Sequence, residues 1–336
     1  MRRPKNHLYT RHQEFARKAD VNQESLFTRI SALIAATALT VAIAPNAKIL
    51  YRSLPFNECS IGDDTSVKEY EKKISTLFDS DFTKDTTNPP ATAYEGKPEI
   101  KMVGLTPSDI ANSAQGIAGR LSEILSRTSS KFIEASGVDT IRIQDIEKDF
   151  DGLNSIGLFT LSLPHSIVID YPNLDYVVNA PEDESDYEQD QATLSGIIIH
   201  EMGHAAVAEF CYTSDPPEEF VDSSAYFESY ADIHNDDEPY YKKGFVSEYA
   251  ATDPAEDIAE TIKAIMGTAL YDPAVNILQL SLNDDNLILR EKVAVILTML
   301  DRLEPGLGAD ALAKMKNSRN ELLKDDMLYH LDGPSG

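Results

Sequence analysis

Apolar residues follow two different periods in this chain of 336 residues, and the change between them predicts its architecture. Residues 138–143 (VDTIRI) alternate between apolar and polar, which is typical of a half-buried strand. Residues 157–170 (GLFTLSLPHSIVID) predict a further strand or a pair of strands, interrupted at Pro164-His165. Short strands are therefore expected in this part of the chain.

Helical spacing dominates on either side of these strands. Thr106 can cap a helix that has Pro107 as its first residue, and Ile117, Leu121 and Leu125 then repeat at helical spacing. The longest predicted helix covers residues 192–212 (ATLSGIIIHEMGHAAVAEFCY) and is mostly apolar. Further helices are predicted at residues 67–78, 254–266, 276–282 and 287–303. The pattern predicts an α+β fold, in which a small mixed sheet packs on helix 192–212 ahead of a helical C-terminal part.

The N-terminal third predicts three other segments. Residues 30–44 (ISALIAATALTVAIA) carry no charge and follow a basic stretch, so they indicate an uncleaved signal anchor or a cleaved signal peptide. The predicted organisation is a basic cytoplasmic tail at 1–29, a signal or anchor segment at 30–47, a linker and accessory region at 48–104, and one domain at 105–336. The anchored form is favoured, with the domain extracytoplasmic; the alternative is a secreted protein.

Charge and cysteine content narrow the function further. The formal net charge is −26, and because residues 1–29 carry a net +4, the rest of the chain carries −30. Such an acidic body is repelled by nucleic acid, which excludes a nucleic-acid partner. Cys59 and Cys211 can form one disulfide if the body lies outside the cytoplasm, and the sequence leaves their pairing open.

Candidate chemistry lies in the middle of helix 192–212. His200 and His204 are four residues apart, so both imidazoles lie on one helix face, where one metal ion can bind them. Glu201 between them can act as general base on a metal-bound water. This is the H-E-x-x-H signature of zinc peptidases, and it predicts Zn²⁺ as the cofactor.

The spacing within the H-E-x-x-H motif does not identify the third zinc ligand. Val207 and Phe210 occupy the positions where another pattern would supply G-x-x-H, so a glutamate from a second helix is expected. Glu228 lies in an E-x-x-x-D pattern similar to the thermolysin-type motif. Glu256 follows Asp253-Pro254, a favourable helix cap and first residue, and would therefore lie in the first turn of a helix.

A second motif adds a resemblance. Residues 249–260 (YAATDPAEDIAE) follow the pattern Y-x-x-T-x-x-x-E-x-x-A-E. Together with the H-E-x-G-H helix, this resembles the catalytic domain of anthrax lethal factor, the bacterial Pro-Pro endopeptidases and a broader set of bacterial zinc metallopeptidases. The resemblance covers roughly residues 106–305 and implies a zincin-like (gluzincin) fold. It also implies Glu256 as third ligand and Tyr249 as the oxyanion donor.

These observations predict a zinc-dependent endopeptidase that acts on peptide or protein substrates. His200, His204 and Glu256 would bind zinc, and Glu201 would be the base. Glu260 would either orient a ligand or be a solvated surface acid. Strand 166–170 is a candidate for the sheet edge that holds extended substrate, or else an ordinary core strand. The alternative function is an inactive, zinc-stabilised extracellular binding or scaffold protein; the oligomeric state is unknown. His165 is expected to be solvated, with a metal role as the less favoured alternative.

Overall fold

The computed structural model describes residues 59–62, 64–79, 98–107, 114–146, 157–160, 165–170, 184–213, 215–221, 226–227, 229–236, 238–267 and 273–324. The chain divides into two units, Met1–Asn57 and Glu58–Gly336, and every described residue belongs to the second. The predicted tail and hydrophobic segment at 1–44 therefore lie outside the described residues. Among the described helices, none combines the length and the apolar character that crossing a bilayer requires.

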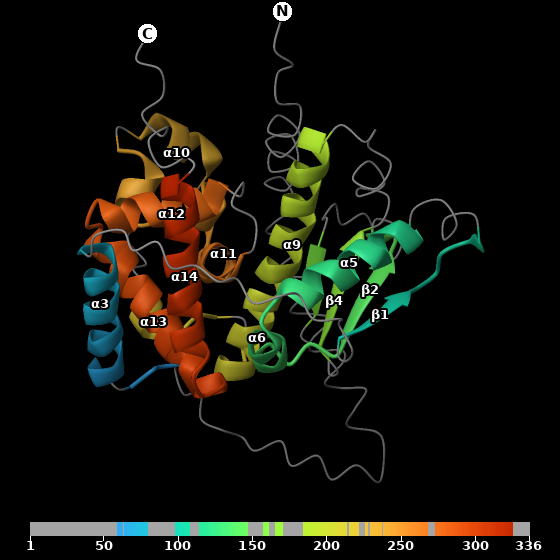
Figure 1. Cartoon of the computed structure of the whole chain (residues 1–336), viewed down its shortest axis with the longest axis horizontal. Helices are drawn as coiled ribbons and strands as arrows, with labels where there is room; N and C mark the ends of the chain where they lie inside the picture. The colour runs from blue at the N-terminus through green and yellow to red at the C-terminus, as the bar shows by residue number, and fades with distance from the viewer. Residues whose placement is uncertain are drawn as a thin grey trace, which may run out of the picture. The chain divides into compact units, whose positions relative to one another are not determined.

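The strands of the described residues form a four-stranded sheet in the order β1-β2-β4-β3 (Figure 1). Its strands are β1 (Glu99–Met102), β2 (Thr140–Gln144), β4 (Ser166–Asp170) and β3 (Gly157–Thr160). The first three in this order are parallel, and β3 is antiparallel to β4. Parallel neighbours need a crossover, and α5 (Gln115–Arg127) and α6 (Ser130–Ala135) lie in the connection from β1 to β2. The predicted strand pair at 157–170 is thus confirmed.

The sequence left strand 166–170 open between the sheet edge that holds substrate and an ordinary core strand, and the structure contradicts the edge and confirms the core strand. β4 pairs with β2 on one side and with β3 on the other, and all five of its residues are buried. The edge strands of this sheet are β1 and β3, and β3, whose four residues are each half-buried, is the edge that contacts α9. The sequence could not decide between the two alternatives, because a short apolar run fits a central strand and an edge strand equally well and sheet order depends on contacts distant in sequence.

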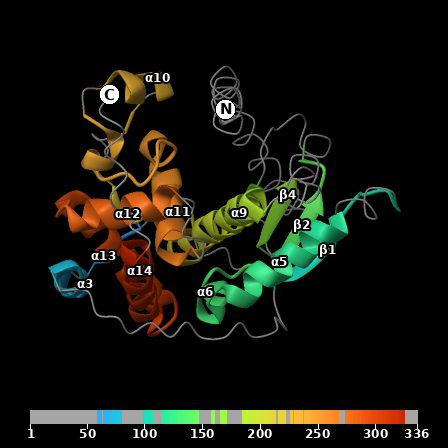
Figure 2. The same cartoon turned by 45° about the horizontal axis from the view of Figure 1, so that its top comes forward.

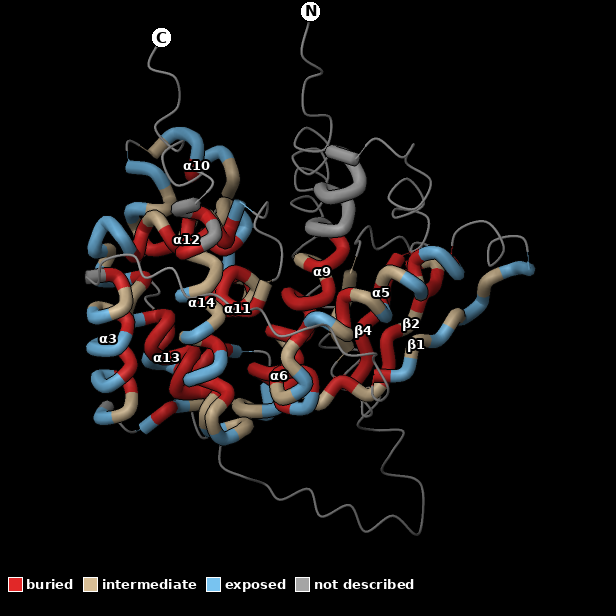
Figure 3. The backbone as a smooth tube through the Cα atoms, in the orientation of Figure 1, coloured by how far each residue is buried: buried red, intermediate tan, exposed pale blue. Residues whose placement is uncertain are grey.

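Helix α9 (Glu184–Cys211) confirms the long predicted helix and lies between the sheet and the C-terminal helices (Figures 1 and 2). It contacts β3 and β4 on one side and α11 (Pro254–Met266) and α13 (Leu287–Leu303) on the other. Leu194, Ile198 and Met202 are fully buried, and Figure 3 shows this stretch of α9 in the colour of buried residues. Burial on both sides explains why the apolar residues of this helix are not confined to one stripe.

The remaining helices complete the unit. α12 (Pro273–Asn283), α13 and α14 (Leu307–Lys324) pack on one another and on α11, and α3 (Asp64–Asp79) packs on α13. Short turns of helix connect α9 to α11: η2 (Glu218–Phe220), α10 (Tyr230–Asn235), η3 (Tyr240–Lys243) and η4 (Ala250–Thr252). The small sheet with mostly helices confirms the α+β prediction in outline. Both α3 and β1 come from the stretch predicted as linker and accessory region.

A disulfide joins the N-terminal end of the described residues to the C-terminal end of α9. Cys59, at the start of the described residues, is bonded to Cys211, the last residue of α9, across 152 positions of sequence. Glu219 reinforces the same junction, because its carboxylate accepts hydrogen bonds from the backbone N–H groups of Ile61 and Gly62 at 2.9 and 3.0 Å. The pairing that the sequence left open is therefore present.

Candidate metal centre

The two histidines lie one turn apart on the face of α9 that meets α11. His200 is 8% exposed and His204 is half-buried, and their rings meet edge to face with centroids 4.7 Å apart. Their Nε2 atoms are 3.0 Å apart. The i, i+4 spacing therefore brings both imidazole nitrogens to one point, as the motif predicts.

Glu256 reaches that point from the first turn of α11. Asp253 caps this helix by accepting a hydrogen bond from the backbone N–H of Ala255 at 2.8 Å, and Pro254 is its first residue. The cap fixes where the helix begins, so Glu256 points from its N-terminal end toward α9. Its Oε2 lies 3.1 Å from His200 Nε2 and 3.3 Å from His204 Nε2.

Gly203 allows the two helices to come this close. A Cβ atom at this position would lie 3.2 Å from the Cα and 3.3 Å from the carbonyl oxygen of Ala259, which follows Glu256 by almost one turn. A glycine inside a helix costs about 1 kcal/mol relative to alanine. In exchange, the backbone of α11 approaches α9 near enough for Glu256 to reach both histidines.

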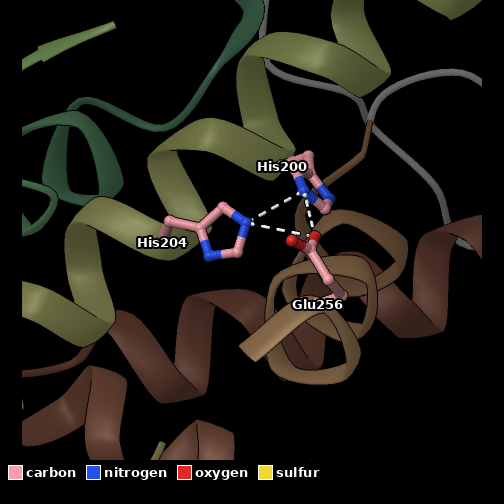
Figure 4. Close-up of side chains that lie close together, drawn as sticks. All are labelled: His200, His204 and Glu256. Carbon is pink, nitrogen blue, oxygen red and sulfur yellow. Dashed lines mark hydrogen bonds and ion pairs between the residues drawn. The ribbon is translucent and has the colours of Figure 1, made fainter. Parts of the chain in front are cut away.

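The spacing of the three atoms fits a tetrahedral metal ion (Figure 4). Ligand atoms at about 2.0–2.1 Å from zinc stand about 3.3 Å apart in a tetrahedron. The three separations in this site are 3.0, 3.1 and 3.3 Å. Among the described residues, His200, His204 and Glu256 are the group of histidine, cysteine and acidic side chains close enough to hold an ion. The group could hold a metal, as the sequence predicts.

Two further observations support this fit. Glu256 Oε2 is buried, and the groups that it faces are the Nε2 atoms of His200 and His204. His200 Nδ1 lies 2.9 Å from Glu260 Oε1. Because a carboxylate can only accept, this contact keeps a proton of His200 on Nδ1, so Nε2 is the nitrogen whose lone pair a metal ion would take in place of a proton. The atom that faces the other two ligands is therefore the one able to bind a cation.

The electrostatics of the group also favour positive charge. Burial by itself lowers the pKa of His200, but its hydrogen bonds with Glu256 and Glu260 raise that pKa to about 10. Burial raises the pKa of Glu256, yet the two imidazoles outweigh it and hold this pKa well below its usual range. The two carboxylates that favour a proton on His200 in the metal-free protein would equally attract a divalent cation.

Glu260 extends the group behind His200, as the sequence predicts. It is 5% exposed, and besides His200 it contacts the Nζ of Lys263 at 2.8 Å. Burial raises the pKa of Glu260, but Lys263 and His200 lower it far more, so the carboxylate is held ionised. An ionised Glu260 fixes the ring orientation and tautomer of His200.

Glu201 lies under the edge strand. It is 8% exposed, and burial raises its pKa, while the two imidazoles and a hydrogen bond from the backbone of Phe159 act in the opposite direction. A Cβ atom at Gly157 would lie 3.0 Å from Glu201 Oε1 and 2.6 Å from Ile197 Cγ2. Only glycine therefore allows β3 to pass this close to the Glu201 carboxylate.

Tyr249 stands at the open side of the group. It is 43% exposed, and its ring centroid lies 5.9 Å from that of His200. Burial and the carboxylates of Glu256 and Glu201 together raise the pKa of Tyr249 well above its usual range. Tyr249 thus stays a neutral hydrogen-bond donor at the site.

Comparisons with known proteins bear on this geometry. Residues 174–298, which include both motifs, match a family model described as "Putative zinc-binding metallo-peptidase". That family is a zinc peptidase family by its description. A crystal structure of a protein from Bacteroides caccae, titled as a putative zinc-binding metallo-peptidase, is 14% identical with a TM-score of 0.40. That match covers 80% of this chain and 98% of the other. No curated protein matches this chain. The likeness to anthrax lethal factor stays a prediction.

Other predicted residues lie elsewhere. The rival ligand Glu228 is outside the described residues. His165 was expected to be solvated, but it is 8% exposed, packs edge to face on Phe159, and has its Nδ1 3.9 Å from Glu209 Oε2. It is not among the residues of the metal-binding group. Its position just before β4 carries it into the sheet, which the preceding proline did not reveal.

Sequence reasoning missed two residues beside the group. Gly157 gave only the signal of a glycine at the start of a predicted strand, and its contact with Glu201 comes from a distant helix. Ser247 lies two residues before the second motif and belongs to no pattern that marks it in the sequence. In the structure its hydroxyl donates to Glu260 Oε2 at 2.8 Å.

Proposed function

We propose that this chain is a zinc-dependent endopeptidase, with zinc bound by His200, His204 and Glu256. The matching family, described as zinc-binding metallo-peptidases, supports the class. The order and spacing of the two motifs support a finer placement beside anthrax lethal factor and the Pro-Pro endopeptidases. The proposal thus assigns the chain to peptide-bond hydrolysis on extended peptide or protein substrates.

The observation that carries the proposal is the position of Glu201 beside an open three-atom group. The ligand atoms of His200, His204 and Glu256 lie within 4.8 Å of one another. A structural zinc site closes with four protein ligands and has no use for a base, whereas a catalytic site has three ligands and an open position. Three ligands together with a buried glutamate therefore favour catalysis.

Each side chain has a role in this proposal. A zinc ion in the site supplies Lewis acidity to the scissile carbonyl and to an attacking water. Glu201, buried beside the two imidazoles, would accept the proton of that water and pass it to the leaving amine. Tyr249 donates its hydroxyl hydrogen to the oxygen that develops negative charge. Glu260 keeps His200 in the binding tautomer.

The edge strand β3 offers a place for substrate. Its residues are half-buried, its partner β4 lies on one side, and its start at Gly157 touches Glu201. An extended peptide can add to an exposed strand edge through backbone hydrogen bonds. A peptide bound along β3 would pass beside Glu201, so we assign to β3 the substrate-binding role that the sequence gave to β4.

The location of the protein is also part of the proposal. Disulfides persist in oxidising compartments, and Cys59 and Cys211 are bonded. Together with the uncharged stretch at 30–44 after a basic tail, this supports an anchored protein with its catalytic unit outside the cytoplasm. Membrane fractionation tests this: the anchored protein sediments with membranes, whereas a mature N-terminus near Lys48 in the medium would show a secreted form.

Incubation with a proteome-derived peptide pool tests the activity. The purified chain is expected to cleave peptides, to stop after treatment with a chelator, and to recover when zinc is added. The Glu201→Gln protein, purified in the same way, controls for contaminating peptidases. A zinc-loaded protein that cleaves no peptide in this pool would contradict the proposal and favour a binding or scaffold protein.

A further inference from the structure

Ser247 connects the turn that carries Tyr249 with helix α11. Its hydroxyl donates to Glu260 Oε2 at 2.8 Å and accepts the backbone N–H of Ala250 at 3.0 Å. Glu260 belongs to α11, whereas Ala250 directly follows Tyr249. One hydroxyl therefore holds the turn of Tyr249 against the helix that carries Glu256.

The connection continues to the proposed ligand His200. The other oxygen of Glu260 lies 2.9 Å from His200 Nδ1. A chain of hydrogen bonds thus runs from the turn through Ser247 and Glu260 to His200. Tyr249 lies beside the last residue of this chain of hydrogen bonds, because the centroid of its ring is 5.9 Å from that of His200.

The Tyr249 side chain has a hydrogen bond with Glu256, and the remaining polar contacts of this turn act farther from Tyr249 or on its backbone alone. Lys292 Nζ donates to the carbonyl of Gly244 at 3.1 Å, and Phe227 N–H donates to the carbonyl of Ala251 at 3.0 Å. Thr252 donates its hydroxyl to the carbonyl of Tyr249 at 2.7 Å, which shapes the turn without attaching it to α11. The Ser247 hydroxyl attaches the turn to a group that touches a proposed zinc ligand.

We propose that Ser247 is a positioning residue that sets the place of the Tyr249 hydroxyl relative to the metal ligands. The inference rests on the proposed function and deepens it, because it explains how a half-exposed tyrosine is held at one distance from the reacting carbonyl. Catalytic groups displaced by about 1 Å lose on the order of 10²-fold in rate. A single hydroxyl at this junction is therefore expected to act on turnover through Tyr249.

Substitution of Ser247 tests the role with a matched control. Ser247→Ala is expected to lower kcat by about 10- to 100-fold. Its zinc affinity, measured by competition with a chelator, should fall by less than about tenfold, because Glu260 keeps His200 and Lys263. Ser247→Thr keeps a hydroxyl and should recover most of kcat. Ser122→Ala in α5 is the control, because the Ser122 hydroxyl also donates a hydrogen bond, to the carbonyl of Ala118 at 3.0 Å, and α5 carries none of the site residues.

A double-mutant cycle separates positioning from general stability. If Ser247 acts through the Tyr249 hydroxyl, adding Ser247→Ala to Tyr249→Phe should slow the enzyme by no more than about twofold. Full additivity of the two effects on kcat, or a Ser247→Ala protein as fast as wild type, would overturn the inference alone. Failure of the wild-type protein to cleave any peptide would overturn the proposed function, and this inference with it.

Discussion

The metal-binding helices and the turn that carries Tyr249 are built in different ways. Helices α9 and α11 meet through apolar packing, in which Ile258, Ala259 and Ile262 are fully buried and Gly203 permits close approach. The Tyr249 turn, residues 244–252, also buries Phe245, Val246 and Ala251, but hydrogen bonds of Lys292 and Ser247 attach it to the neighbouring helices as well. Apolar packing brings the proposed ligands together, and polar contacts add to packing in holding the proposed oxyanion donor. Changes in the first region should therefore remove metal, and changes in the second should slow turnover with metal in place.

The largest effect is expected at Glu256. Glu256→Ala removes one of three ligands, and two histidines alone hold zinc weakly, so both metal and activity should be lost. Zinc content per chain, by elemental analysis after dialysis, measures the effect. Glu228→Ala is the control and should keep about one zinc per chain. The reverse result for the two variants would show a thermolysin-like ligand set.

Substitution of Glu201 tests whether a change in helix α9 can remove turnover without removing the metal. Glu201→Gln keeps all three proposed ligands, so zinc content should remain near that of wild type. Removal of the general base should lower kcat by about 10²- to 10⁴-fold. Peptide cleavage and zinc content are measured on the same preparation. Near wild-type turnover in the glutamine variant would rule out the proposed base.

Substitution of Tyr249 tests whether a change in the turn slows turnover while zinc stays bound. Tyr249→Phe removes one hydroxyl and little volume, and because Tyr249 is half-exposed, folding should be unaffected. Loss of an oxyanion donor is expected to lower kcat by about 10²- to 10³-fold with zinc content unchanged. Steady-state kinetics on one peptide from the pool gives the value. An unchanged kcat would mean that Tyr249 only packs on His200.

The smallest effect among these is expected at Gly157, where the edge strand meets the helix. In Gly157→Ala the new methyl group would press on Ile197 and Glu201, so β3 or the carboxylate must shift by several tenths of an ångström. A loss of about 10- to 100-fold in kcat is expected, with zinc retained. Gly119→Ala in α5 is the control, because no atom of the described residues would lie within 4 Å of its new methyl group. Equal kinetics for the two variants would contradict the close contact.

The same contrast explains what the sequence could predict. His200, Glu201 and His204 share one helix, so their relative placement follows from helical geometry and is visible in the spacing. Glu256 was predictable through a cap and a motif, both local in sequence. The sequence left the position of strand 166–170 in the sheet open, because β4 and β3 differ only in which strands flank them. Ser247 and Gly157 act through contacts with distant helices, and no local pattern marks such contacts.

X-ray absorption at the zinc edge of the zinc-loaded protein tests the central claim most directly, because it reads the ligands of the metal itself. The predicted spectrum shows two imidazole nitrogens and oxygen ligands at about 2.0–2.1 Å with no sulfur. In Glu256→Ala, any residual zinc should lose one oxygen ligand. A wild-type spectrum without two imidazoles, or one left unchanged by Glu256→Ala, would contradict the assignment of His200, His204 and Glu256 as the metal ligands.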